Sequence, residues 1–167
     1  LFPNLVTIGT SVPLGRYIFR VFPGKRTWLD PILAPIERLV LRLTSVDTLQ
    51  QQTWKQYALS LLVANVCMWL LTFAIVSVQK FLPLNPDGIG NMEPTLAFNT
   101  VSSFVTNTNL QHYSGETGLS YFSQMFVISF LQFVTAATGV AACIATIRGL
   151  GGNRLTQLGN FYVDLPR

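Results

Sequence analysis

Charged side chains are scarce in this sequence. Only 11% of the 167 residues are Asp, Glu, Lys or Arg, whereas a soluble domain carries about 25%. Hydrophobic residues make up 50% of the chain. So few charges cannot cover the surface of a water-soluble fold. The composition therefore argues against an ordinary soluble domain and indicates a membrane protein.

Metal-ligating and redox-active residues are equally rare. The chain has one histidine, His112, so a histidine-rich metal site is excluded. Its two cysteines, Cys67 and Cys143, both lie in apolar runs. We expect two buried thiols that pack as small hydrophobic side chains, rather than a disulfide or a metal pair. The sequence also lacks Lys and Arg clusters interleaved with aromatic residues, which argues against nucleic-acid binding.

The chain does contain two long runs without a charge. The first, residues 57–78, has 22 residues and would extend ~33 Å as a helix, enough to cross the hydrocarbon core of a bilayer. The second, residues 119–147, is long enough to span with some tilt. We therefore predict an all-α integral membrane protein with spans at 57–80 and 118–147.

A shorter helix is predicted between the two spans, over residues 92–105. Asn91 can cap its free N–H groups, Glu93 suits the positive end of the helix dipole, and Pro94 fits the first turn. About a dozen residues are too few to cross a bilayer. A half-helix enters a membrane only where its end is buried in protein or lines a water-filled cavity, so we expect a re-entrant pore helix.

The run that follows this helix is rich in Thr and Asn, and we interpret it as a selectivity filter. A potassium ion that sheds its water needs several oxygen ligands, which carbonyls, hydroxyls and amides can supply. The negative end of the helix dipole lies beside the run, and residues 101–113 hold no carboxylate, so a monovalent cation is favoured. Asn107 and Asn109 can adopt the left-handed backbone conformation that aims carbonyls at one axis. The alternative is an extracellular loop without function.

The basic residues predict an orientation. Seven of the eleven Lys and Arg residues precede the first span, three follow the second, and only Lys80 lies between the spans. By the positive-inside rule, both flanks are cytoplasmic and the short helix with its polar run faces outside.

The segments on either side of the two spans show less regular sequence patterns. Residues 1–22 are expected to be the end of a truncated N-terminal membrane helix, and residues 149–167 a truncated cytoplasmic tail. Within the cytoplasmic segment 23–56, apolar residues from Ile32 to Leu43 recur at helical spacing. That amphipathic helix either lies along the bilayer surface or packs on its own protein.

Several stretches resemble one known family. They are WKQY at 54–57, FLPLNP at 81–86, LAFNTVSSFVTNTNLQHYSGE at 96–116, LSYFSQM at 119–125 and LGNFYVDL at 158–165. They are similar to the potassium-binding A subunit of the bacterial Kdp potassium-transporting ATPase. That resemblance implies a potassium-transporter-superfamily fold, in which four membrane–pore–membrane repeats follow an extra N-terminal helix. The chain matches the tail of that helix and the first repeat, residues 57–148, so we expect a fragment.

The resemblance also implies a site, partners and a location. Oxygen atoms of the filter, residues 105–111, would bind potassium in a multi-pass subunit of the bacterial cytoplasmic (inner) membrane. ATP hydrolysis belongs to a partner P-type ATPase catalytic subunit, and small membrane subunits complete the complex. No DKTGT-like phosphorylation motif or nucleotide-binding loop is present in this chain, which agrees with a non-catalytic, nucleotide-free role. The implied filter residues are Val105, Thr106, Asn107, Thr108, Asn109 and Gln111, with potassium ligands from the first four and an influence of Gln111 on affinity.

Other functions remain open at this point. A stand-alone two-helix channel subunit could tetramerise and build four equivalent filters, although the chain lacks a TVGYG-like glycine filter. A non-conducting membrane anchor would tolerate substitution of Thr106 and Gln111, whereas a filter would lose ion affinity. An intramembrane enzyme is disfavoured because no nucleophile motif accompanies His112.

Overall fold

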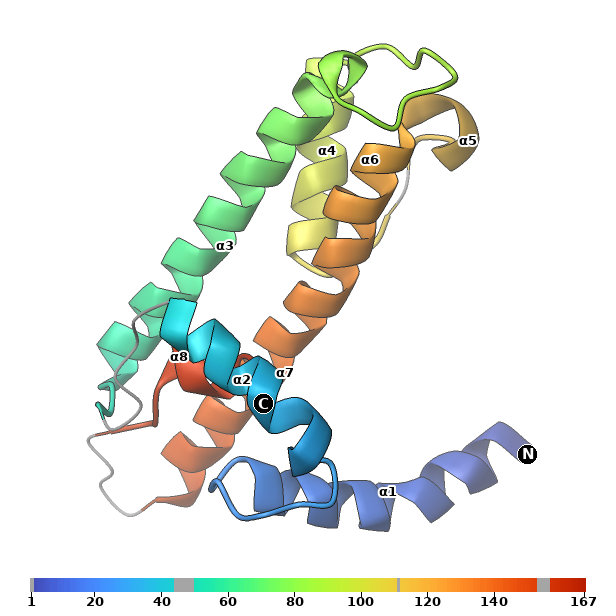
Figure 1. The fold of residues 1–167 in the computed structure, drawn as a ribbon. Helices are drawn as coiled ribbons and strands as arrows, with labels where there is room; N and C mark the ends of the chain where they lie inside the picture. The colour runs from blue at the N-terminus through green and yellow to red at the C-terminus, as the bar shows by residue number, and fades with distance from the viewer. Residues whose placement is uncertain (1, 44–49, 111, 153–156) are drawn as a thin grey trace.

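All regular elements that the structure describes are helices (Figure 1). The structure is a computed structural model, and it describes residues 2–43, 50–110, 112–152 and 157–167. Two of its helices are long and apolar enough to cross a membrane, and they stand side by side as the two long rods of the molecule.

The first long helix is α3 (Trp54–Ser77). Its start is fixed by a capping box, in which Gln56 N–H donates to the Thr53 hydroxyl and Thr53 N–H donates to the Gln56 side chain. It begins three residues before the predicted span, ends at Ser77, and is followed by a single 3₁₀ turn, η1 (Gln79–Phe81). Apart from Lys55 in its first turn, α3 carries no charge, as is typical of a helix that lies in lipid.

The second long helix runs from Tyr121 to Gly151 and has 31 residues. It consists of α6 (Tyr121–Ser123), a π-helical turn η2 (Gln124–Ser129) and α7 (Phe130–Gly151). The Ser120 side chain starts it by accepting the N–H of Ser123. The π-helical turn was not predicted, because its sequence is as apolar and uncharged as its surroundings.

The chain between the two long helices enters the space between them and returns to the end from which it entered. Helix α4 (Pro94–Val105) starts beside the end of α3, runs between the two rods and stops part-way along them (Figure 1). The chain then returns to α5 (Gly115–Gly118), close to the start of α6. We call residues 91–118 the intervening segment; its Gln111 is not among the described residues.

One core joins α3, α4 and the second long helix. Its buried members are Val76, Met92, Ala97, Val101, Phe104, Leu119, Val127, Ile128 and Leu131. Four of them come from α4 and its approach, so the short helix is the hub that the two long helices pack against. Close van der Waals packing of these side chains holds α4 between the rods, as is typical of helices inside a membrane.

The other end of the molecule carries the remaining helices. There α1 (Phe2–Val21) lies crosswise to the rods, α2 (Asp30–Leu43) crosses in front of them, and α8 (Phe161–Asp164) packs near the start of α3. Among the described residues α1 is not one of the helices that are long and apolar enough to span. The interpretation of residues 1–22 as a membrane helix therefore stays a prediction.

A partly buried ion pair closes this end. Arg148 at the end of α7 donates to both carboxylate oxygens of Asp164, at 2.6 and 3.1 Å. The Tyr57 hydroxyl of α3 lies 3.2 Å from the same carboxylate and 3.0 Å from the carbonyl of Ala141. One acidic side chain thus ties both long helices to α8.

The prediction of two buried cysteines is wrong: Cys67 and Cys143 are both exposed on this chain. The physical reason is that each long helix buries only a narrow stripe, and both thiols lie outside it. Large apolar side chains such as Leu59, Leu62 and Phe133 are exposed on the same helices, as expected for surfaces that face lipid or other membrane helices.

Candidate functional site

The candidate site begins with the start of α4. Glu93, not Asn91, is the N-cap: its carboxylate accepts the N–H of Leu96 at 2.9 Å and the hydroxyl of Thr95. Those hydrogen bonds, with Thr95 contributing most, hold the pKa of the Glu93 carboxyl below its ordinary value. The prediction that Asn91 caps α4 is wrong, because its side chain accepts the N–H of Lys80 instead.

A tryptophan of α3 holds the far end of α4. The indole N–H of Trp69 donates to the hydroxyl of Ser102 at 2.9 Å. Its ring stacks on Phe73 at 4.9 Å and meets Phe98 edge-on at 5.4 Å. Since Trp69 lies eight residues before Ser77, or ~12 Å along the helix axis, α4 ends well below the end of α3.

Helix α4 ends in a Schellman motif. Asn107 has φ 56°, in the left-handed region, and its N–H donates to Phe104 O at 3.1 Å. The N–H of Thr108 reaches back to Ser103 O at 2.8 Å. These two bonds are the signature of this helix ending, with Asn107 in the position that glycine usually takes. The predicted tolerance of Asn for this conformation is confirmed, and Asn109 adopts it as well, with φ 55°.

Ser103 also accepts hydrogen bonds from the next residues of the loop. Its carbonyl accepts a second N–H, from Asn109 at 3.2 Å, and its buried hydroxyl accepts the N–H of Leu110 at 2.7 Å. With Thr106 N–H donating to Ser102 O at 3.0 Å, five successive backbone N–H groups, from Thr106 to Leu110, all point back into α4.

This pattern fixes where the carbonyl oxygens go. In a trans peptide the C=O of one residue points opposite to the N–H of the next, and the chain has no cis peptide among the described residues. The five carbonyls from Val105 to Asn109 therefore point away from α4. Across the described residues, no hydrogen bond to these oxygens is found. The structure thus presents a row of free carbonyl oxygens on an exposed loop.

The side chains of the loop add further oxygens. The hydroxyl of Thr106 donates to Ser102 O at 2.8 Å and lies 2.9 Å from the hydroxyl of Thr108. The amide of Asn109 donates to the side-chain oxygen of Asn107 at 3.2 Å. The structure therefore brings together Val105, Thr106, Asn107, Thr108 and Asn109 from the predicted site; Gln111 lies outside the described residues.

Three residues that hold this site in place were not predicted. They are Trp69, Ser102 and Ser103. A tryptophan inside an apolar span was a usable signal, because a buried indole N–H needs a hydrogen-bond acceptor. Nothing in the sequence distinguishes Ser103, which caps the loop, from its neighbour Ser102, which binds α3.

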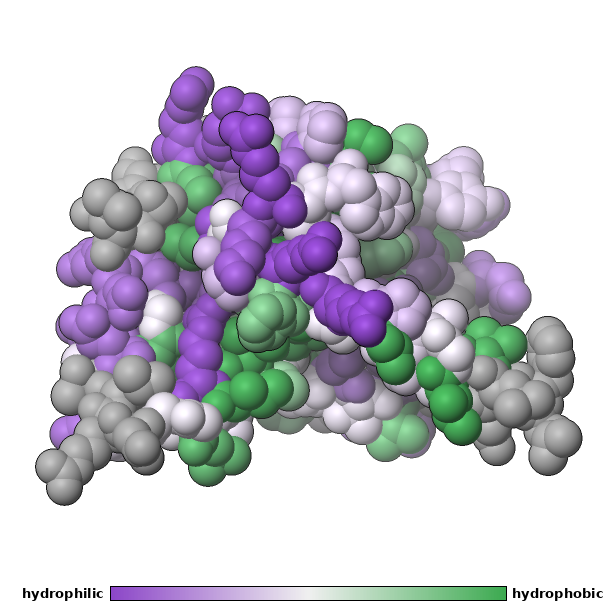
Figure 2. Space-filling model, turned by 90° about the horizontal axis from the view of Figure 1, so that it is seen from below, coloured by the Kyte–Doolittle hydropathy of each residue, from purple (hydrophilic) through white to green (hydrophobic). Residues whose placement is uncertain are grey.

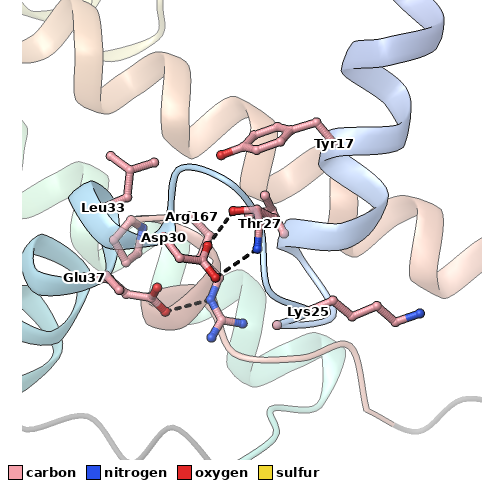
Figure 3. A pocket seen from close by; sticks show the side chains of 11 residues that line it. Tyr17, Lys25, Thr27, Asp30, Leu33, Glu37 and Arg167 are labelled. Atoms are coloured by element: carbon pink, nitrogen blue, oxygen red, sulfur yellow. Dashed lines mark hydrogen bonds and ion pairs between the residues drawn. The ribbon is translucent and has the colours of Figure 1, made fainter.

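A cavity of about 130 Å³ lies at the opposite end of the molecule, at the corner between α1 and α2 (Figure 3). Three of its four charged side chains, those of Asp30, Glu37 and Arg167, already have polar partners. Asp30 accepts the N–H of Thr27 at 2.9 Å, and Arg167 pairs with Glu37 at 2.7 Å (Figure 3). The hydrogen bonds from Thr27 lower the pKa of the Asp30 carboxyl below its ordinary value. The cavity is remote from the carbonyl row and takes no part in the candidate site.

The family model described as the potassium-transporting ATPase A subunit matches residues 2–167. The chain belongs to this family. A potassium-transporting ATPase potassium-binding subunit from Pseudomonas fluorescens is 51% identical over 154 residues, which cover 92% of this chain and 27% of the relative.

Two further relatives carry the same description. The one from Caldanaerobacter subterraneus subsp. tengcongensis is 48% identical and covers 93% of this chain and 28% of its own length. The one from Alicyclobacillus acidocaldarius is 48% identical and covers 98% of this chain and 29% of its own length. The chain thus spans 27–29% of the length of these relatives. Membership of this family, together with the two long apolar helices, makes it a membrane protein.

Proposed function

We propose that this chain supplies one filter segment to the potassium-binding subunit of a Kdp-type potassium-transporting ATPase. The observation that carries the proposal is the row of carbonyls from Val105 to Asn109. Each points away from α4 because the following N–H is held by α4. Backbone carbonyls presented in this way replace the hydration shell of potassium. The ligands are oxygens of Val105, Thr106, Asn107 and Thr108, with Asn109 and Gln111 completing the filter.

The proposal treats α4 as a re-entrant pore helix. With 12 residues it extends ~18 Å, too short to cross a bilayer. Its end is wedged between the two long helices by the indole of Trp69 and by the buried ring of Phe104. Free carbonyls at that depth are acceptable only if they face protein or a hydrated path, which is what an ion pathway provides.

The charge distribution supports the orientation. The end with α1, α2 and α8 carries the basic flanks, and Figure 2 shows a broad hydrophilic area on that face. The opposite end has Lys80 together with the acidic residues Asp87, Glu93 and Glu116. By the positive-inside rule, the basic end lies in the cytoplasm of the bacterial cell and the intervening segment opens to the outside.

One filter segment surrounds an ion from one side only. Residues 106–110 are exposed on this chain, so other filter segments must contribute the remaining oxygens. The relatives, of which this chain matches 27–29%, are long enough to provide them in one polypeptide. Energy from ATP comes from a partner catalytic subunit in this proposal, since the relatives' descriptions assign them potassium binding.

The test uses an assembled complex. Residues 2–167 replace the matching segment of the Pseudomonas fluorescens subunit, and potassium-dependent ATP hydrolysis is measured. The substitution Thr106→Val removes a filter hydroxyl, and we expect the half-saturating potassium concentration to rise. The matched control is Thr146→Val, whose hydroxyl makes a comparable bond to Ala142 O at 2.9 Å on α7.

The result separates the candidate functions. A membrane anchor would show the same potassium dependence with Thr106→Val as with Thr146→Val, and this would refute the filter. Potassium conductance from a cross-linked tetramer of this chain alone would instead support the independent channel subunit.

A further inference from the structure

The side chain of Gln79 is fully buried although it is polar. Gln79 is 0% exposed and lies in η1, the turn that follows α3. The amide donates to Gly90 O at 2.8 Å and to Gly118 O at 2.9 Å. Its oxygen accepts the N–H of Ser120 at 3.2 Å. Both donor hydrogens and the acceptor of the side chain are thus in use.

The three partners of Gln79 sit at the two ends of the intervening segment. Gly90 comes immediately before the segment, and Gly118 and Ser120 stand where it leaves for α6. The partners are 11, 39 and 41 residues away in sequence. One side chain therefore joins the end of α3 to the start and to the finish of the segment that carries the filter.

The start of the segment has additional ties to α3. The N–H of Met92 donates to Val76 O at 3.3 Å, and the side chain of Asn91 accepts the N–H of Lys80 at 3.0 Å. At the finish, Gln79 provides two of the hydrogen bonds, to Gly118 and Ser120. Loss of the Gln79 amide therefore frees the C-terminal end of the intervening segment more than its N-terminal end.

We propose that Gln79 is a positioning residue that closes the intervening segment and thereby sets the apparent affinity for potassium. The inference rests on the proposed filter function. Gln79 does not touch the ion: it fixes both ends of a loop whose middle presents the carbonyls. A loop with one loose end samples other conformations, and only the fraction in the binding conformation contributes to affinity.

The variant Gln79→Glu tests this with almost no change in shape. A carboxyl group at this buried position donates one hydrogen when it is protonated and none when it is ionised, so at least one of the two carbonyls, of Gly90 and Gly118, loses its partner. We expect the half-saturating potassium concentration of the chimaeric complex to rise about tenfold, as for loss of one buried hydrogen bond. The maximal rate of ATP hydrolysis should stay within about twofold, because the ion-bound state is unchanged in structure.

The matched control is Gln52→Glu, at the other end of α3. The amide of Gln52 also makes a donor bond, to Ser60 Oγ at 2.9 Å, and an acceptor bond, from Phe161 N–H at 2.9 Å. Its substitution introduces the same carboxyl group at the other end of α3 without touching the intervening segment. Gln79→Met, which removes all polar atoms, serves as a second variant and should shift the affinity in the same direction.

The outcomes are distinct. A raised half-saturating concentration in both Gln79 variants, with Gln52→Glu unchanged, supports the proposal. Unchanged affinity, an equal shift in the control, or failure of both Gln79 variants to assemble would overturn it, since Gln79 would then act on folding alone. Absence of potassium dependence in the unsubstituted chimaera would refute the filter function itself, which separates the two failures.

Discussion

The left-handed conformation of Asn107 allows the backbone and the side chain to be tested separately as potassium ligands. In the proposed filter the backbone carbonyl at position 107 points outward because Thr108 N–H is held by Ser103 O at 2.8 Å. Glycine adopts φ 56° without strain and asparagine tolerates it, whereas most other residues with a β-carbon lose about 1–2 kcal/mol there. Valine adds the penalty of a branched β-carbon.

The assay is potassium-dependent ATP hydrolysis by the chimaeric complex. Asn107→Gly keeps the carbonyl in place, so we expect the half-saturating potassium concentration to stay within about twofold. Asn107→Val destabilises the loop conformation by about 1–2 kcal/mol, which corresponds to a roughly tenfold loss of apparent affinity. If Asn107→Gly weakens binding as much as Asn107→Val does, the side-chain amide is the ligand and the backbone argument is refuted.

Three further predictions concern the serines of α4, the two ion pairs and the cap of α4. Ser103→Ala leaves the N–H of Leu110 without its acceptor, a loss of about 1 kcal/mol, and should weaken potassium affinity. Ser102→Ala removes the acceptor of Trp69, which holds α4 as a whole, and should lower thermal stability as well as affinity. Asp164→Asn breaks the ion pair with Arg148, in which the Asp164 side chain is 3% exposed and the Arg148 side chain 27% exposed. It should reduce the free energy of unfolding in detergent by about 3 kcal/mol. Glu37→Gln breaks the pair with Arg167, whose carboxylate is more exposed than that of Asp164, and should change the free energy of unfolding by less than about 1 kcal/mol. The lowered pKa of Glu93 means that its cap stabilises α4 above the ordinary pKa of 4.5 and is lost as the pH falls through the lowered value. The protection factor of the Leu96 amide, which is the exchange rate of an unstructured amide at the same pH divided by its own exchange rate, should therefore fall on acidification, and Glu93→Gln should abolish that pH dependence.

The placement of α4 illustrates what the sequence could predict. Pro94 fits only the first turn of a helix, and the length of the apolar stretch that follows limits the helix to a few turns. The choice of cap was harder. Asn91 and Glu93 both suit a helix start, and only the three-dimensional neighbourhood shows that Asn91 is occupied by the N–H of Lys80.

The inward faces of the long helices could not be predicted. In α3 nearly every residue is apolar, so periodicity does not distinguish the side that packs on α4 from the side that faces outward. The cysteines were misplaced for this reason, since Cys67 and Cys143 lie on outward sides. Local backbone chemistry was more informative: Asn at alternate positions predicted the left-handed residues of the loop, which Asn107 and Asn109 are.

The contacts that hold the site join residues far apart in the chain. Trp69 and Ser102 are 33 residues apart, and Gln79 and Ser120 are 41 apart. Their residue types alone do not name their partners. The candidate ligands could therefore be proposed from one stretch, while the residues that position them required the folded structure.

The most direct test of the filter is to locate the ion. Crystals of the chimaeric complex soaked in rubidium or thallium salts would show the cation by its anomalous scattering. The account predicts a peak in direct contact with the carbonyl oxygens of Val105, Thr106, Asn107 and Thr108. A bound cation elsewhere on the subunit, with these oxygens facing only bulk water or lipid, would contradict it.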